Sequence, residues 1–187
     1  ADLSIGEPDF ATPEPIAAAV ADAVGAGASG YTQTAGRSDL RAAIAEKLAD
    51  ANGIHADPET EVIVTPGAMG ALFAATQVVA DAGDEVLLPE PYWSNYHGHV
   101  ANTGADLVTV PTAAADDFVP DPEAIARRIT DDTAGVILNT PNNPTGAVVP
   151  PSTLRAIGEV LEAHDLWAIL DETYEDLVYN GAVHHSL

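Results

Sequence analysis

The sequence has 187 residues, long enough for one hydrophobic core, and its 29 acidic residues outnumber 6 Lys plus Arg to give a formal net charge of -23. So few basic residues leave no patch that could neutralise phosphates, and we expect neither a nucleic acid nor a membrane as partner. The absence of cysteine excludes disulfides and thiolate metal sites.

The first part of the chain predicts two helices. A short helix is expected over residues 14–24, where Ala and Val recur at helical spacing after two prolines. A polar loop over residues 30–36 follows. The second helix is expected over residues 39–52, with Ser38 as its N-cap and Gly53 as its stop.

Strands alternate with helices over the rest of the chain. The predicted strands cover residues 61–65, 85–88, 106–110, 135–138 and 166–170. The predicted helices between them cover residues 68–81, 92–102, 122–129 and 152–164. Such alternation is typical of βαβ units. The sequence therefore predicts one α/β domain, with a mostly parallel sheet and helices on both faces.

Polar residues follow two of the predicted strands. The strand at 135–138 leads into a rigid turn rich in proline and asparagine, and the strand at 166–170 leads directly into Asp171. Ligands of open α/β sheets bind outside the carboxyl ends of the strands. We therefore expect the amide of Asn143, the carboxylate of Asp171 and the phenol of Tyr174 at one rim.

A third feature is the turn between the predicted strand at 61–65 and the helix after it. The backbone N–H groups at a helix start point outward, and the helix dipole favours an anion there. Gly67 lets a ligand approach the backbone closely. The turn lacks the spacing of a Walker loop or a dinucleotide fingerprint, and a glycine at such a turn is by itself also consistent with a plain turn.

Several motifs, in this order, resemble the class I and II aminotransferases, the aspartate-aminotransferase-like family of fold-type-I pyridoxal-phosphate enzymes. They lie at residues 4–10, 31–36, 40–41, 65–72, 89–93, 139–146 and 171–174. Each is suggestive alone, and their order and spacing are specific. The resemblance implies that residues 1–187 are the cofactor-binding large domain of an enzyme that transfers an amino group from an L-amino acid to a 2-oxo acid.

The resemblance also implies roles for the residues at the strand ends. Asp171 would pair with the protonated pyridine nitrogen of pyridoxal 5'-phosphate, and Tyr174 and Asn143 would donate to its ring oxygen. Asp171 and Tyr174 are the expected catalytic residues. Trp93 would stack on the ring, although an isolated Trp near a strand end is also consistent with core packing. The residues expected to hold the phosphate are Gly67, Ala68 and Met69.

Further implied contacts concern the substrate and a second subunit. The backbone of Gly6 would contact the substrate carboxylate, with Trp93 and Asn143 also near the substrate. Tyr31 would reach the cofactor phosphate of the other subunit, which predicts a homodimer. A Tyr that packs within its own loop is the alternative for Tyr31. Related enzymes also have cis peptide bonds at the positions of Glu90–Pro91 and Asn143–Pro144, so we expect both here.

The sequence departs from the family in its lysines. Its one lysine, Lys47, lies on the second predicted helix, whose apolar face is built from Leu40, Ile44 and Leu48, so we expect Lys47 to face solvent. In the family the Schiff-base lysine and the arginines that bind the cofactor phosphate and the substrate α-carboxylate lie downstream of the Asp-x-x-Tyr motif. We therefore expect a domain truncated at both ends that is inactive alone.

Met69 stands where some aspartate-preferring relatives carry lysine, which leaves neutral and aromatic substrates open. His97 and His99 are expected to be a surface pair, as is the pair beginning at His184, and no metal site is predicted. A lyase or decarboxylase on the same scaffold and a non-catalytic regulatory module are the alternative functions.

The spread of acidic residues along the chain has two interpretations, an ordinary acidic protein or a salt-adapted protein of a halophile. We favour salt adaptation, because the Debye length falls to about 3 Å at 1 M salt and self-repulsion is then screened. No apolar run approaches the ~18 residues of a membrane span. Residues 1–4 show no signal-peptide pattern, so we expect a cytoplasmic protein.

Overall fold

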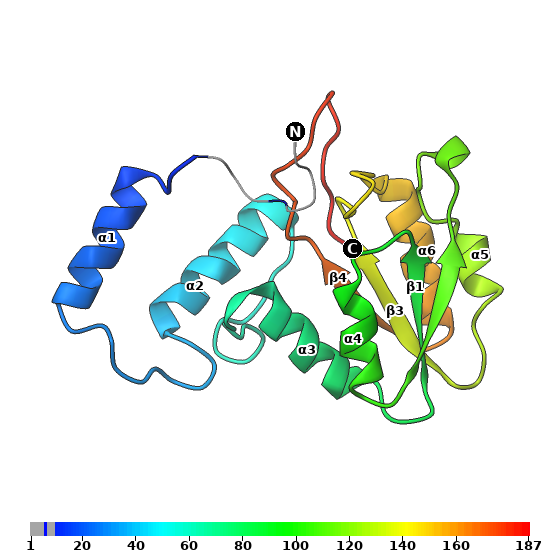
Figure 1. The fold of residues 1–187 in the computed structure, drawn as a ribbon, viewed down its shortest axis with the longest axis horizontal. Coiled ribbons are helices and arrows are strands. Elements are labelled where there is room, and N and C mark those ends of the chain that lie inside the picture. The colour runs from blue at the N-terminus through cyan, green and yellow to red at the C-terminus, as the bar shows by residue number, and fades with distance from the viewer. Residues whose placement is uncertain (1–5, 7–9) are drawn as a thin grey trace. The chain divides into compact units, whose positions relative to one another are not determined.

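The computed structural model describes residue 6 and residues 10–187 (Figure 1). The chain forms two compact units, residues 1–34 and 35–187. The first unit contains helix α1 (Glu14–Gly25), which has a proline in its first turn and no buried residue. This helix confirms the prediction for residues 14–24.

The second unit is built on one sheet of four parallel strands in the order β2-β1-β3-β4. The strands are β1 (Glu85–Glu90), β2 (Asp106–Pro111), β3 (Thr133–Asn139) and β4 (Trp167–Asp171). Each contains one of the predicted strands or most of it. The register of β3 and β4 sets Asn139 opposite Asp171, the last residue of each strand.

The helices of this unit follow the predicted ones closely. They are α2 (Ser38–Lys47), which continues into a π-helical turn η1 (Leu48–Asn52), α3 (Gly67–Val79), α4 (Asn95–Ala101), a 3-10 turn η2 (Ala114–Asp116), α5 (Pro122–Ala126) and α6 (Pro151–Ala163). In the described part of the chain, no helix combines the length and the apolar character needed to cross a membrane.

The core lies on both faces of the sheet, because successive strand residues point to opposite sides. Val86 and Leu88 of β1 pack with α3 and α4 on one face. Leu87, between them, packs with α5 and α6 on the other face. Helices therefore cover both faces of a parallel sheet, which confirms the α/β prediction.

Two local predictions are wrong. Residues 61–65 form no strand: the N–H of Val64 donates to the carbonyl of Ala35 at 2.9 Å, so this segment pairs with a loop residue instead of a strand. Ser38 is not an N-cap, because the extended backbone of Arg37 precedes the helix and Ser38 is its first residue. Gly53 does end the helical segment, with a left-handed φ of 72°.

The turns after β1 and β3 contain cis peptide bonds. Glu90–Pro91 and Asn143–Pro144 are both cis, as expected. Thr140–Pro141 is a third cis bond, which the sequence did not predict.

Candidate functional site

A pocket of about 310 Å³ lies where α3 begins and where β3 and β4 end. Seven of the predicted site residues line it: Gly67, Ala68, Met69, Trp93, Asn143, Asp171 and Tyr174. Pro66, Tyr96, Asn139 and Thr173 complete its lining. The structure therefore brings together residues from distant parts of the sequence, at the start of one helix and the carboxyl ends of two strands.

The central group of the pocket is the carboxylate of Asp171, which is only 9% exposed. Its Oδ1 accepts hydrogen bonds from the backbone N–H of Thr173 at 3.0 Å and from the Thr173 hydroxyl at 2.6 Å. Its Oδ2 accepts from the phenol of Tyr96 at 2.7 Å. Burial of an anion is costly without partners. These bonds offset that cost and leave acceptor capacity for another donor, since a carboxylate has about four lone-pair sites.

Tyr96 is a site residue that the sequence analysis missed. It is 1% exposed, and its ring meets that of Trp93 edge-on, with centroids 5.5 Å apart and planes at 87°. Burial, followed by the hydrogen bond to Asp171 and the charge of that group, raises the pKa of the Tyr96 phenol above its ordinary value. The phenol is therefore a permanent donor to Asp171 at neutral pH. Its spacing of one helical turn from Trp93 was the available signal.

Asn139 and Asn143 connect the ends of β3 and β4. The Asn139 amide donates to the backbone carbonyl of Asp171 at 2.9 Å, and its Oδ1 accepts from the N–H of Asn143 at 2.7 Å. The side-chain amide of Asn143 then donates to the phenol oxygen of Tyr174 at 3.3 Å. The rigid turn thus holds the amide of Asn143 and the phenol of Tyr174 together at the pocket wall.

The opposite part of the lining is the first turn of α3. Gly67 has a φ of +73°, which favours glycine, and its N–H and carbonyl both bond to Thr65, at 2.8 Å in each case. No side chain caps this helix. The N–H of Gly67 is thus already used within the turn, and the N–H groups of Ala68 and Met69 are the ones open to an anion, with the helix dipole in support. The pocket therefore pairs an anion-binding helix start with a buried carboxylate that suits a cation.

The remaining predicted site residues lie in the first compact unit. Gly6 and Tyr31 are both exposed there. Residues 4, 5 and 7–9 of the motif around Gly6 lie outside the described residues. The substrate contact of Gly6 and the cross-subunit contact of Tyr31 stay predictions.

The predictions for the histidines need correction. His97 is exposed, but His99 is buried, because Tyr96, His99 and Val100 form the face of α4 that packs on the core. The His99 ring lies edge-on to Phe73 with centroids 6.3 Å apart. His184 is also not a surface residue: its side chain is 8% exposed and its Nε2 lies 3.5 Å from Oε1 of Glu172.

The chain is similar to known proteins in both sequence and fold. The family model described as aminotransferase class I and II matches residues 1–186. The chain is 46% identical to the probable aspartate/prephenate aminotransferase of Thermus aquaticus over 180 residues, which are 96% of this chain and 47% of that protein. It is 40% identical to the arginine–pyruvate transaminase of Pseudomonas aeruginosa over 179 residues, 96% of this chain and 45% of that protein.

Two solved structures are similar over 98% of this chain. The aspartate aminotransferase of Thermus thermophilus with maleate has a TM-score of 0.93 and 42% identity, and the match covers 48% of it. The aromatic aminotransferase of Pyrococcus horikoshii has a TM-score of 0.96 and 41% identity, and the match covers 49% of it. The chain thus spans about half the length of the relatives it matches.

Proposed function

We propose that this chain, which belongs to the class I and II aminotransferases, forms the cofactor-binding part of a pyridoxal-phosphate-dependent transaminase. The reaction would move the amino group of an L-amino acid to a 2-oxo acid in two half-reactions. The observation that carries the proposal is the buried carboxylate of Asp171 in the same pocket as the uncapped start of α3.

The lining of the pocket fits pyridoxal phosphate group by group. The N–H groups of Ala68 and Met69 would hold the phosphate, and Gly67, whose own N–H donates to Thr65, would let it approach the backbone closely. Asp171 would accept a hydrogen bond from the protonated ring nitrogen, because its carboxylate has acceptor capacity left beside its contacts with Tyr96 and Thr173. When bound, the cofactor supplies an electron-accepting ring.

Other side chains would orient the ring. The amide of Asn143 and the phenol of Tyr174, 3.3 Å apart, would both donate to the ring oxygen. Trp93 would supply a flat face, since its edge-on contact with Tyr96 fixes the plane of the indole. Together these contacts would hold the ring in one orientation in the pocket.

The lysine and the carboxylate-binding arginine of this chemistry would come from residues beyond the 187 of this chain. Lys47 is the only lysine of the sequence, and its ammonium is paired with Glu175. The relatives are about twice as long as the matched segment, which leaves room for both groups. We accordingly propose that the chain alone does not turn over substrate.

The substrate class follows from Met69. This residue is 45% exposed at the pocket wall, and its sulfur lies 3.6 Å from the amide nitrogen of Asn95. A thioether offers no charge to a distal carboxylate. We therefore propose neutral or aromatic amino acids as donors.

The oligomeric state and the environment are further parts of the proposal. Tyr31 supports a homodimer as the active unit, and the net charge of -23 supports a salt-rich cytoplasm.

The proposal is tested with the full-length protein that carries this chain. The protein is loaded with pyridoxal phosphate, mixed with one L-amino acid and no acceptor, and followed by absorbance and by the 2-oxo acid released. A transaminase converts the bound cofactor once and releases about one equivalent of 2-oxo acid. Release of carbon dioxide, or no spectral change with any L-amino acid, would contradict it.

A further inference from the structure

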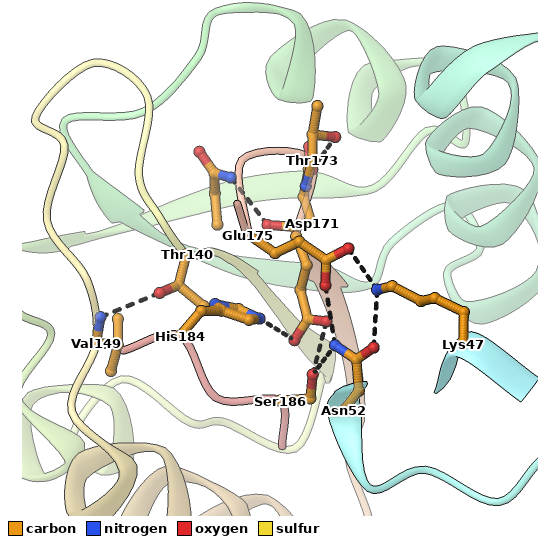
Figure 2. Close-up of polar contacts among 11 residues, drawn as sticks. Lys47, Asn52, Thr140, Val149, Asp171, Thr173, Glu175, His184 and Ser186 are labelled. Carbon is orange, nitrogen blue, oxygen red and sulfur yellow. Dashed lines mark hydrogen bonds and ion pairs between the residues drawn. The ribbon is translucent and has the colours of Figure 1, made fainter. Parts of the chain in front are cut away.

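A set of polar side chains lies on the side of the Glu172–Glu175 turn that faces away from the pocket (Figure 2). The turn itself is short and is closed by the N–H of Glu175, which donates to the carbonyl of Glu172 at 3.0 Å. Its inner residues, Thr173 and Tyr174, line the pocket. The carboxylates of Glu172 and Glu175 take part instead in the network shown in Figure 2.

Glu175 is held at both carboxylate oxygens. Its Oε1 pairs with the ammonium of Lys47, and its Oε2 accepts from the side-chain amide of Asn52 at 2.9 Å. Lys47 also donates to Oδ1 of Asn52 at 2.8 Å, which orients that amide. Both anchors come from the end of α2 and from η1, more than 120 positions earlier in the chain.

The network continues to Glu172 and closes on the turn. The amide of Asn52 also donates to the hydroxyl of Ser186 at 2.9 Å, and that hydroxyl donates to Oε2 of Glu172 at 2.8 Å. His184 lies 3.5 Å from the other oxygen of Glu172. The carboxylates of Glu172 and Glu175 are thus both held by this network. The two residues between them, Thr173 and Tyr174, line the pocket.

The contacts with Lys47 and Asn52 stabilise the ionised form of the Glu175 carboxyl. Burial raises the pKa of this carboxyl, but the hydrogen bonds from Asn52 and Lys47 outweigh burial and the pKa is lowered. The carboxylate is therefore charged at neutral pH and remains paired with Lys47. The donor atoms of Glu172, Glu175 and His184 lie within 4.8 Å of one another, but both oxygens of Glu175 already have partners in the network.

Tyr174 depends on this support more than Asp171 does. Asp171 belongs to β4 and accepts three hydrogen bonds of its own. Among the described residues, the phenol of Tyr174 has the single hydrogen bond from Asn143, at 3.3 Å. Its position is therefore set by the backbone of the turn, and the turn is held by Glu175.

We propose that Glu175, anchored by Lys47 and Asn52, is a positioning residue that holds the phenol of Tyr174 toward the bound ring. The proposal rests on the proposed function. It assigns the single lysine of the chain a positioning role, distinct from the covalent lysine of the family. A displacement of about 1 Å in a group of this kind is enough to slow catalysis strongly while substrate binding is retained.

The test uses the full-length protein with Lys47→Met, Glu175→Gln and the double variant. Lys47→Arg keeps the positive charge and serves as the rescue. Asp176→Asn is the matched control, because Asp176 is an exposed carboxylate in the same turn. Three quantities are measured: hydrogen exchange of amides 172–177 in the cofactor-free protein, the pH midpoint of the bound cofactor's absorbance, and kcat with KM.

Both single variants should speed exchange in the turn by about tenfold. They should move the absorbance midpoint to higher pH, because a phenol that donates to the ring oxygen favours its negative charge. We expect kcat to fall about tenfold with KM within about twofold, and the double variant to be no worse than either single variant. Lys47→Arg, which keeps the positive charge, should have the wild-type exchange rate, absorbance midpoint and kcat. Asp176→Asn should have the wild-type values as well.

Wild-type exchange in the single variants, or additive losses in the double variant, would overturn the proposal. Faster exchange with an unchanged absorbance midpoint would also overturn it, since the network would then support only the turn. A wild-type protein without transaminase activity contradicts the proposed function instead. Exchange in the cofactor-free protein separates these outcomes, because it is independent of activity.

Discussion

The phenol of Tyr96 donates a hydrogen bond to Oδ2 of Asp171 at 2.7 Å, and both side chains are buried. The contact joins α4 to the end of β4 and fixes one oxygen of the carboxylate. Thr173 fixes the other oxygen. The orientation of Asp171 toward a ligand is thus determined by residues on both sides of it.

Replacement of Tyr96 by Phe should weaken both stability and catalysis. The change leaves Oδ2 of Asp171 without its buried donor, which costs about 1–3 kcal/mol of unfolding free energy. The first half-reaction should slow by about tenfold, the equivalent of ~1.4 kcal/mol. Denaturant unfolding and stopped-flow absorbance measure the two effects. Tyr179→Phe is the control, because Tyr179 is 72% exposed; equal effects of both variants would refute the role of Tyr96.

The raised pKa of Tyr96 predicts how stability changes with pH. The folded protein keeps this proton at pH values where the unfolded chain, with a tyrosine pKa near 10.0, has lost it. The contribution is therefore fully present below pH 10 and is lost as pH rises further. Unfolding curves between pH 8 and pH 11, at intervals of about one unit, should show a steeper alkaline decline for wild type than for Tyr96→Phe. Parallel curves would contradict the assignment.

The substitution Met69→Lys tests the proposed substrate class. An ammonium at this position of the pocket wall could pair with a distal carboxylate, whereas the thioether cannot. We expect kcat/KM for aspartate relative to phenylalanine to rise by about tenfold or more, since one charge-assisted contact is worth ~1.5–3 kcal/mol. Met69→Leu is the control for size. An unchanged ratio in Met69→Lys would mean that this position does not determine specificity.

The acidic composition predicts stability that increases with salt. At a net charge of -23 the carboxylates repel one another in dilute buffer, and screening reduces that repulsion. The melting temperature measured by circular dichroism should rise between dilute buffer and ~2 M KCl. An equal concentration of sucrose controls for solute effects that do not depend on charge. A melting temperature that stays flat or falls in KCl argues against salt adaptation.

The strands of the sheet were predictable from the sequence because each contains a run of apolar residues that ends at polar ones. The apolar runs before Asn139 and Asp171 form β3 and β4, and the polar residues at their ends meet as the parallel arrangement requires. Residues 61–65 have an equally good pattern but no neighbouring strand among the described residues, so they bond to a loop instead. A strand needs a partner, and a local pattern cannot supply one.

The pocket residues that belong to a sequence motif could be predicted. Those that reach the pocket or its surroundings only through tertiary packing could not. Asn143, Asp171 and Tyr174 belong to motifs that stand out in the sequence. Tyr96 resembles any buried tyrosine on a helix, and its spacing from Trp93 does not by itself reveal the hydrogen bond to Asp171. The burial of His184 likewise depends on how the end of the chain meets Glu172, a contact between distant turns that periodicity does not encode.

We propose that Asp171 stabilises the positive charge of a bound pyridine ring, and the variant Asp171→Ala of the full-length protein is the sharpest test of that role. Single-turnover absorbance with a saturating L-amino acid gives the half-reaction rate, and a cofactor titration gives the dissociation constant, with Asp176→Ala as the matched control. The rate should fall about 10³-fold while cofactor affinity weakens much less, because the phosphate contacts at α3 remain. A rate within a few-fold of wild type, about 1 kcal/mol, would contradict the account.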